Sequence, residues 1–250
     1  LSEKKDQLNS LKRKYGGEIE AMLDYNRKIK KKLVDFDSYK ENLDDVNRKI
    51  DKVKLELEKV SKELSKKRKA GGGKLSKKVG EKLGSLGMQD AEFKIELPPG
   101  QLGPSGREEV LFKIKTNPGE SLMELKKVAS GGETSRIMLA LKSVLADADS
   151  IPILIFDEID TGIGATIGSR VAVEIKKLSK YHQIIVVTHM PQIASKADIH
   201  FKISKGKKGD RTVTGIKKID SAERLEEIAR LLGGKDNETA KKQAGELIKS

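Results

Sequence analysis

Residues 22–64 carry a long, regular repeat of apolar side chains, which limits the possible folds more than any other feature. Apolar residues alternate at spacings of three and four, and only Lys32 interrupts the seam. They are Met22, Tyr25, Ile29, Phe36, Tyr39, Leu43, Val46, Ile50, Val53, Leu57, Val60 and Leu64. About six heptads of this kind predict a coiled coil. At about 1.5 Å per residue, the helix would extend roughly 65 Å.

Such a seam needs a second helix to cover it. Residues 1–21 are too short and are interrupted by Gly16-Gly17, so we expect the partner helix to come from another polypeptide or from sequence before Leu1. Gly71-Gly72-Gly73 predicts a break at the other end of the helix. We therefore predict a coiled-coil arm over residues 1–70, a junction over 71–90 and a globular lobe over 91–250.

The lobe begins and ends with strand pairs and helices. Ala91–Leu97 and Val110–Thr116 alternate apolar and polar residues, which predicts a hairpin joined by a Pro/Gly-rich loop over 98–106. Residues 199–204 and 212–219 predict a second pair around a basic turn over 205–211. Asp220 begins a capping-box sequence, so we expect a helix that ends at Leu232 and a last helix over 238–248.

A chemical signal follows the apolar run Ile153–Phe156, where Asp157 and Glu158 stand next to each other. The run predicts a fully buried parallel strand. Open α/β sheets bind ligands at the carboxyl ends of such strands. There, Asp157 would hold Mg²⁺, and Glu158 would polarise the water that attacks a γ-phosphate.

Glycines precede this strand in Ser130-Gly131-Gly132-Glu133, ahead of a helical pattern over 135–145. Their backbone N–H groups can approach an anion at a helix N-terminus, and Ser130 would cap the helix or bind phosphate. Taken alone, the segment is better explained as a capped helix after a glycine turn. A second buried run over 184–187 ends at His189, which could reach a phosphate in the same crevice. Asp160-Thr161-Gly162 predicts a turn that extends across a dimer interface.

The order of these segments resembles the C-terminal lobe of an ABC-type ATPase head. With the arm, the chain resembles the structural-maintenance-of-chromosomes-like (SMC-like) family, and within it the branch that repairs bacterial DNA. The residues that carry the resemblance are Leu11–Gly16, Val128–Glu133, Ile155–Gly164, Val187–Ala194, Arg211–Thr214 and Ala229–Gly234. Thr134 departs from the pattern, because the family usually has Leu there, and the glycines between 71 and 84 are unusually many.

The resemblance implies an α/β fold and the C-terminal half of an ATPase that acts in recombinational repair of DNA double-strand breaks. ATP would be sandwiched between two heads of a head-to-head homodimer and would drive head engagement. Ser130, Gly131, Gly132 and Glu133 would contact the nucleotide, with the first three capping the γ-phosphate of the opposite head. Asp157 would bind Mg²⁺, Glu158 would be the general base, His189 would sense the γ-phosphate and Asp160 would organise the facing site.

A phosphate loop of the form G-x-x-x-x-G-K-[ST] is needed for such a site. The Gly-Lys pairs at 73–74, 206–207 and 234–235 are not followed by Ser or Thr. We therefore expect this chain alone to be inactive, and the N-terminal head half and arm of the same protein to be its partners.

The charge points to DNA. There are 51 Lys and Arg against 38 Asp and Glu, a net charge of +13, and residues 1–90 hold 25 of the basic and 16 of the acidic residues. Binding would be electrostatic and independent of base sequence, because Trp is absent and aromatic residues are few. The candidate contacts are Lys66, Lys67, Arg68, Lys69, Lys205, Lys207 and Lys208; a solvated helix face is an equally good interpretation of these runs.

Composition sets the remaining limits. The absence of Cys excludes disulfides and thiolate metal sites. No long apolar run or signal peptide is evident, so we expect a cytoplasmic, nucleoid-associated protein without a membrane partner. Two alternatives stay open. One is a non-enzymatic coiled-coil DNA-bridging or interaction protein, against which the intact Asp157, Glu158 and His189 argue. The other is an SMC-type head that organises chromosomes. Such a head would share the ATPase motifs of this chain but not its segments over 160–164 and 229–234.

Overall fold

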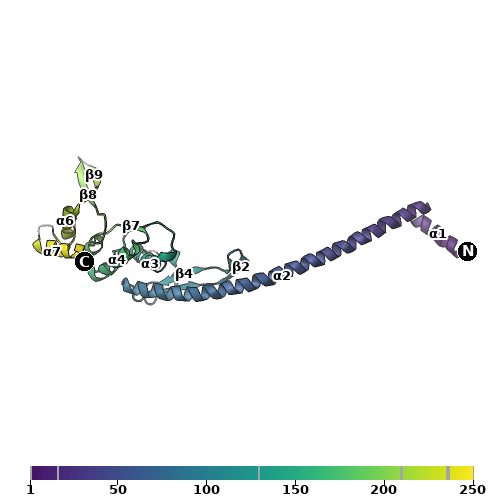
Figure 1. Ribbon diagram of the computed structural model, residues 1–250, viewed down its shortest axis with the longest axis horizontal. Helices are drawn as coiled ribbons and strands as arrows, with labels where there is room; N and C mark the ends of the chain where they lie inside the picture. Colours follow the sequence, from purple (N-terminus) through teal and green to yellow (C-terminus); the bar gives the residue numbers. More distant parts are fainter. Residues whose placement is uncertain (1, 16, 129, 209–210, 235–236, 250) are drawn as a thin grey trace. The chain divides into compact units, whose positions relative to one another are not determined.

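The structure is a computed structural model that describes residues 2–15, 17–128, 130–208, 211–234 and 237–249. The chain divides into two compact units, Leu1–Leu64 and Ser65–Ser250. We call the first the arm unit and the second the head unit. One helix, α2 (Ile19–Ser85), contributes residues to both (Figure 1).

The arm unit consists of α1 (Ser2–Tyr15) and the first part of α2. Gly17 lies between them with φ 80°, a conformation that glycine adopts without strain. Its N–H donates to the carbonyl of Lys12 at 2.6 Å. The rings of Tyr15 and Tyr25 then approach with centroids 5.4 Å apart. The predicted interruption near Gly16-Gly17 is confirmed, although Gly16 itself lies outside the described residues.

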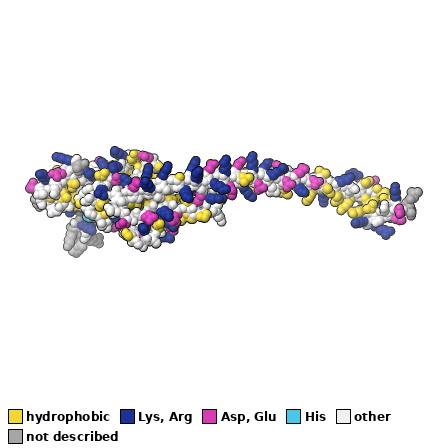
Figure 2. All heavy atoms as spheres, turned by 90° about the horizontal axis from the view of Figure 1, so that it is seen from below, with side chains coloured by type: hydrophobic (Ala, Val, Ile, Leu, Met, Phe, Trp, Pro, Cys, Tyr) yellow, Lys and Arg dark blue, Asp and Glu magenta, His cyan; other side chains and the backbone are white. Residues whose placement is uncertain are grey.

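Side chains of the seam face solvent in the arm unit. Phe36 is 70% exposed and Tyr39 is 69% exposed, and Leu43, Val53 and Val60 are each more than half exposed. In Figure 2, hydrophobic side chains gather where α1 and the beginning of α2 lie. The predicted helix is thus confirmed, and within the described part of this unit the seam has no covering helix.

The predicted break at Gly71-Gly72-Gly73 is wrong, because α2 runs through all three glycines to Ser85. A glycine weakens a helix by about 1 kcal/mol relative to Ala. Packing outweighs that penalty here. A Cβ placed on Gly72 would lie 3.6 Å from Ile95, so the helix passes close to the first strand. Further along α2, Val79 and Leu83 are fully buried in the core, as is Leu86 just after the helix ends.

Antiparallel strands lie beside this part of α2 (Figure 1). β1 (Glu92–Glu96), β4 (Leu111–Lys115) and β5 (Met123–Glu124) form one sheet in the order β1-β4-β5. The predicted hairpin is therefore confirmed. The predicted loop over 98–106 is wrong, since it contains β2 (Pro99–Gly103), which pairs with β3 (Gly106–Glu108). Backbone hydrogen bonds hold this segment together although its side chains give little strand signal.

The Asp157–Glu158 pair follows the first of two parallel strands. β6 (Ile153–Phe156) pairs with β7 (Gln183–Val186), and α4 (Ala165–Leu178) connects them. Between β5 and β6 the chain forms the short 3₁₀ helix η1 (Leu125–Lys127), then α3 (Gly131–Val144), and then a second 3₁₀ helix, η2 (Ala146–Ala148). α3 and α4 contribute Ile137, Leu139, Val171 and Leu178 to the main core.

The strands of this pair are only half buried, so the prediction of fully buried strands is wrong. Leu154 and Phe156 face the core, whereas Ile153 is 47% and Ile155 is 68% exposed. Ile185 and Val187 on the neighbouring strand are about half exposed as well. Successive side chains point to opposite faces of a sheet, and helices of the described chain cover one face only. The other face is apolar and open.

The C-terminal part confirms most of its predicted elements. α5 (Pro191–Ala194) precedes the hairpin of β8 (Phe201–Lys208) and β9 (Arg211–Lys218), in which most of the predicted basic turn is strand. Asp220 caps α6 (Ser221–Leu231) through a full capping box, and Gly233 follows with φ 124°. α7 (Glu238–Lys249) packs on α6 around Ile228, Ala229, Ala240 and Ala244. None of the described helices is apolar and long enough to span a bilayer.

Candidate functional site

Asp157 and Glu158 directly follow β6, and both side chains are exposed. The backbone N–H of Glu158 donates to Asp157 Oδ1 at 2.9 Å. Glu158 has φ 55°, the only left-handed backbone among the non-glycine residues that the structure describes. Such a conformation costs about 1–3 kcal/mol and persists only where the surroundings hold it. The backbone at this carboxylate is therefore held in a strained turn.

The first turn of α3 lies against Glu158. Gly131 and Gly132 belong to this turn, and Ser130 takes the N-cap position without a side-chain cap hydrogen bond. A Cβ on Gly131 would lie 2.4 Å from Glu158 Oε2, so alanine there would displace the carboxylate. A Cβ on Gly132 would lie 3.0 Å from the Glu158 carbonyl oxygen and from Thr161 Cβ. The glycines thus permit close contact between α3 and the turn after β6.

Two side chains of α3 bind carbonyls of that turn. Ser135 Oγ donates to the Asp157 carbonyl at 2.6 Å. Arg136 Nη1 donates to the Thr161 carbonyl at 2.8 Å and to the Ile159 carbonyl at 3.4 Å. Burial lowers the pKa of the Arg136 guanidinium, and the Glu133 carboxylate opposes this shift. Arg136 did not stand out in the sequence, because nothing in its neighbours indicates that it is buried.

Asp160 is buried and turns toward the end of β7. Its Oδ2 accepts hydrogen bonds from Thr188 Oγ1 at 2.5 Å and from the His189 N–H at 2.9 Å. His189 Nδ1 lies 3.1 Å from the same oxygen, and the imidazole is 77% exposed. Asp160 therefore fixes the histidine within its own chain. The carboxylate itself is 4% exposed, and the extension of its turn across a dimer interface stays a prediction.

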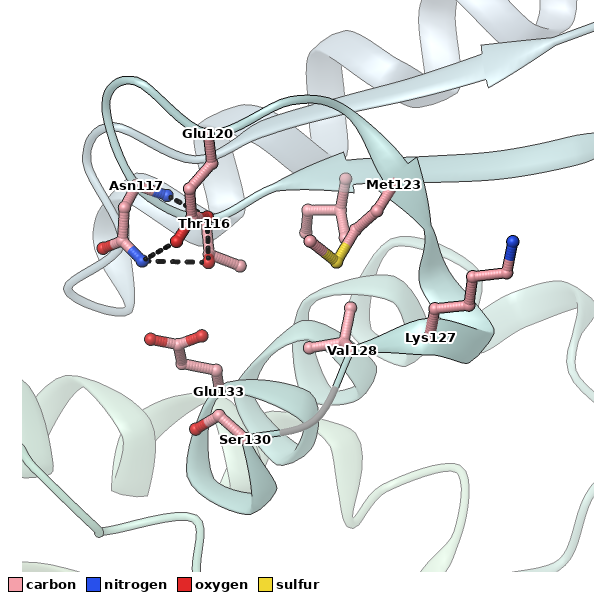
Figure 3. A pocket seen from close by; sticks show the side chains of 9 residues that line it. Thr116, Asn117, Glu120, Met123, Lys127, Val128, Ser130 and Glu133 are labelled. Carbon is pink, nitrogen blue, oxygen red and sulfur yellow. Dashed lines mark hydrogen bonds between the residues drawn. The ribbon is translucent and has the colours of Figure 1, made fainter.

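A cavity of about 230 Å³ opens beside the α3 N-terminus. Figure 3 shows Ser130 and Glu133 pointing into it from α3, opposite the loop that carries Thr116, Asn117 and Glu120. Asn117 and Thr116 donate hydrogen bonds to the Glu120 carboxylate and lower its pKa. Met123 and Val128 form an apolar wall. Asn117 and Glu120 were missed, since a polar loop gives no motif.

The first basic run lies along a groove of about 670 Å³ in the head unit. Lys66 and Lys69 of α2 and Lys94 of β1 line this groove with Ile95 and Leu97. Arg68 is half-buried and pairs with Glu108 at 3.8 Å, whereas Lys67 is exposed and does not line the groove. The structure thus separates Arg68, which has an acidic partner, from its lysine neighbours.

The second basic run lies on β8. Lys205 is exposed there, and the backbones of Lys207 and Lys208 continue the strand, while their side chains lie outside the described part. Lys202 on the same strand pairs with Glu227 at 2.5 Å. On the face shown in Figure 2, basic side chains alternate with acidic ones along the molecule. Of the predicted basic residues with described side chains, Lys66, Lys67, Arg68, Lys69 and Lys205, none forms an ion pair with Asp157 or Glu158; Arg68 pairs with Glu108 instead.

Mg²⁺ chemistry is compatible with this site. Protein Mg²⁺ sites often use one or two carboxylates, with substrate phosphates and water as the other ligands. Asp157 offers one exposed carboxylate. The described residues contain no cluster of three or more His, Cys, Asp and Glu side chains that could hold a metal ion. The nucleotide would therefore have to supply other ligands.

A parallel strand that ends in Asp-Glu, a glycine turn at a helix N-terminus and a histidine after the next strand define the C-terminal lobe of an SMC-type ATPase head. The structure agrees with this class. A crystal structure of the Smc head domain with a coiled coil and joint from Pyrococcus yayanosii has a similar fold, with a TM-score of 0.61 and 21% identity; the match covers 92% of this chain and 42% of that chain.

The family follows from the sequence comparison. Residues 8–212 match the family described as RecF/RecN/SMC N terminal domain, and the chain belongs to this family. Within it the sequence is RecN-like. It is 35% identical to DNA repair protein RecN of Bacillus subtilis (strain 168), over 98% of this chain and 45% of that protein. It is 43% identical to DNA repair protein RecN of Rickettsia felis, over 70% of this chain and 32% of that protein. The chain thus spans less than half the length of these relatives.

Proposed function

We propose that this chain is the C-terminal half of an SMC-like ATPase that acts in recombinational repair of DNA double-strand breaks. The observation that carries the proposal is the contact between the Asp157-Glu158 turn and the glycines of α3. This contact fixes the turn that presents the two carboxylates to an ATP on the same head and leaves the α3 N-terminus to serve an ATP on a second head. Both tasks suit phosphoryl transfer, which depends on positioning and charge stabilisation. The relatives named RecN point to DNA repair as the process.

In this proposal each residue of the site has one task. Asp157 supplies an oxygen ligand to Mg²⁺, which would neutralise phosphate charge when bound. Glu158 accepts a proton from the attacking water. His189, held by Asp160, presents its free imidazole edge to the γ-phosphate. Ser130, Gly131 and Gly132 contact the γ-phosphate of the ATP on a second head, and Glu133 faces the cavity next to it.

Glu158 and a bound phosphate would compete for one place. Both are anions, and the Glu158 carboxylate already lies against Gly131 at the positive end of α3. Engagement of the second head would therefore release Glu158 from its own α3. This gives head engagement a direct effect on the general base.

The open apolar face of β6 and β7 supports a second lobe that completes the head. Ile153, Ile155 and Ile185 together expose a contiguous apolar surface, which would be unfavourable in water. The N-terminal head half of the same protein is the proposed cover, and its arm is the proposed partner of the seam. The absent phosphate loop would then lie on that half.

ATP hydrolysis by the complete protein tests the proposal. Glu158→Gln should lower kcat by ~10²–10⁴-fold while ATP binding is retained, because a general base contributes on that scale. Glu81→Gln, at an exposed glutamate of α2, is the matched control and should leave kcat unchanged. The present chain should show no Mg²⁺-dependent hydrolysis until the N-terminal half is added. Hydrolysis by this chain alone, or full activity in the Glu158 variant, would refute the assignment.

DNA is the proposed partner, through non-specific contacts with phosphates. Lys66, Lys69 and Lys94 converge from two elements on one groove, which is why the first basic run is the better candidate. Binding should weaken steeply between ~50 and 200 mM salt, since bound cations are released from DNA. Replacing Lys66, Lys67 and Lys69 with Glu should flatten this slope; Arg68 should be kept, because its partner is Glu108. Replacing Lys205, Lys207 and Lys208 tests the alternative on β8.

A further inference from the structure

Arg136 has an environment that its burial alone does not explain. Only 7% of the residue is exposed, and none of the ion pairs among the described residues includes its guanidinium, although the Glu133 carboxylate lies near enough to raise its pKa. Among the described residues its Nε has no hydrogen-bond partner. Taking an unpaired charge out of water is unfavourable, and an apolar side chain would fill the same space without that penalty. The compensation for this penalty is the pair of hydrogen bonds that Arg136 donates to the Ile159 and Thr161 carbonyls, which an apolar side chain could not make.

Those carbonyls belong to alternate residues of one turn. α3 binds the carbonyls of Asp157 through Ser135 and of Ile159 and Thr161 through Arg136. The side chains between them point elsewhere. Glu158 lies against Gly131, and Asp160 binds Thr188 and the His189 backbone. Adjacent residues of α3 thus hold only the backbone of this turn, and the two acidic side chains make separate contacts with Gly131 and with Thr188 and His189.

Arg136 also lies close to the strained residue. Glu158 keeps φ 55° although it is not glycine, so the bonds on either side of it must maintain that conformation. Ser135 binds immediately before it, and Arg136 binds one and three residues after it. Loss of the Arg136 bonds would leave Ser135 as the only one of the three side-chain anchors from α3. The bonds within the turn itself, from the Thr161 N–H to the Glu158 carbonyl at 3.0 Å and from the Glu158 N–H to Asp157 Oδ1 at 2.9 Å, would remain.

We infer that Arg136 is a positioning residue that fixes the backbone from Ile159 to Thr161, and thereby aims the Glu158 carboxylate and the Asp160–His189 pair. Arg136 itself touches neither nucleotide nor water in this role. The inference rests on the proposed ATPase function and extends it to a residue behind the site. A misplacement of about 1 Å can lower a rate by ~10²-fold, so the effect should be on kcat.

The test uses the complete protein and three variants. Arg136→Met keeps the length but removes every donor, and should lower kcat by ~10–100-fold with a KM for ATP within about twofold of the parent. Arg136→Lys keeps one cationic donor and should recover at least part of that loss. Arg170→Met, at an exposed arginine of α4, is the matched control and should behave as the parent.

The outcomes separate this inference from the proposed function. An inactive parent protein refutes both. An active parent with unchanged kcat in Arg136→Met refutes the positioning role alone. If Arg136→Met unfolds, Arg136→Lys decides: a folded lysine variant with lowered kcat and unchanged KM supports the inference, and parental kcat overturns it. If Arg136→Met raises KM and lowers thermal stability but leaves kcat unchanged, Arg136 is a merely structural residue and the inference is refuted.

Discussion

The two units of this chain use the same kinds of apolar residues with opposite results. On α2, Leu83 of the head unit is fully buried, whereas Leu57 of the arm unit is 46% exposed. Both residues follow a helical apolar pattern, and both lie on one continuous helix. The head unit brings strands and helices of its own chain onto its part of the helix, and the arm unit does not. Periodicity therefore identifies the face of a helix that can be buried, but a partner is needed to bury it.

The largest expected difference lies between two leucine variants. Leu83→Ala should lower the free energy of unfolding by about 2–5 kcal/mol, because it leaves a cavity in a packed core. Leu57→Ala should change it by less than ~0.5 kcal/mol at concentrations where the chain is a monomer, since the side chain is then partly exposed and loses few contacts. Denaturant unfolding followed by circular dichroism measures both.

The same pair of variants reports on association of the arm. An exposed seam favours pairing with the proposed N-terminal arm or, without it, self-association. If Leu57→Ala proves as destabilising as Leu83→Ala, the seam is already buried in solution. Concentration-dependent stability and sedimentation would identify self-association as the cause. A monomer at high concentration with an intact helix would contradict the expectation of pairing.

An intermediate effect should come from ion pairs. Hydrogen bonding by Arg230, with Lys202 also contributing, lowers the pKa of the buried Glu227 to about 2 from 4.5. Because the folded pKa is lower than the unfolded one, this stabilisation is present above pH ~4.5 and is lost as the pH falls toward ~2. Its size is roughly 3 kcal/mol. Glu227→Gln should remove this part of the pH dependence of unfolding.

The arm unit provides the control for that measurement. Asp45 and Lys49 lie 2.9 Å apart, but both side chains are more than half exposed. Exposed pairs of this kind contribute about 0.3–0.5 kcal/mol. Asp45→Asn should therefore leave the acid transition almost unchanged. A large effect of Asp45→Asn, or none of Glu227→Gln, would remove the electrostatic contrast between the units.

Two glycine variants, one in each unit, should change stability in opposite directions. Gly73 lies inside α2 with open space around its Cα, so Gly73→Ala should stabilise the head unit by about 1 kcal/mol. Gly17 also has open space, but its φ of 80° suits glycine, so Gly17→Ala should destabilise the turn by about 1–2 kcal/mol. Thermal unfolding of the two variants measures both signs. A stabilising Gly17→Ala would show that the turn adopts another backbone in solution.

Local sequence predicted those elements whose signals are local. The capping box at Asp220, the hairpin of β8 and β9 and the parallel strands β6 and β7 were all evident from short patterns. The break at Gly71–Gly73 was predicted wrongly. Each glycine costs the helix about 1 kcal/mol, and the free energy gained by burying Val79 and Leu83 of α2, with Leu86 just after it, outweighs that cost. The β2–β3 hairpin gave too little side-chain pattern to be recognised.

The candidate site divides in the same way. Asp157, Glu158 and the glycines of α3 were identified from motif order, and the structure brings them together. Their roles in catalysis remain predictions. Arg136 and Ser135 were missed, because their bonds join residues more than twenty positions apart. Hydrogen bonds to backbone carbonyls depend on three-dimensional placement and leave no trace in residue type.

The sequence by itself determined the long seam, the family and the order of the chemical groups, because each depends on residue type and spacing along the chain. The tertiary structure decided which of these groups meet and which surfaces stay open. Asp160 binds within its own chain, Glu158 adopts a strained backbone beside Gly131, and one face of β6 and β7 remains apolar and exposed. The physical reason is that burial and hydrogen bonding are properties of neighbours in space, which the chain acquires only when it folds.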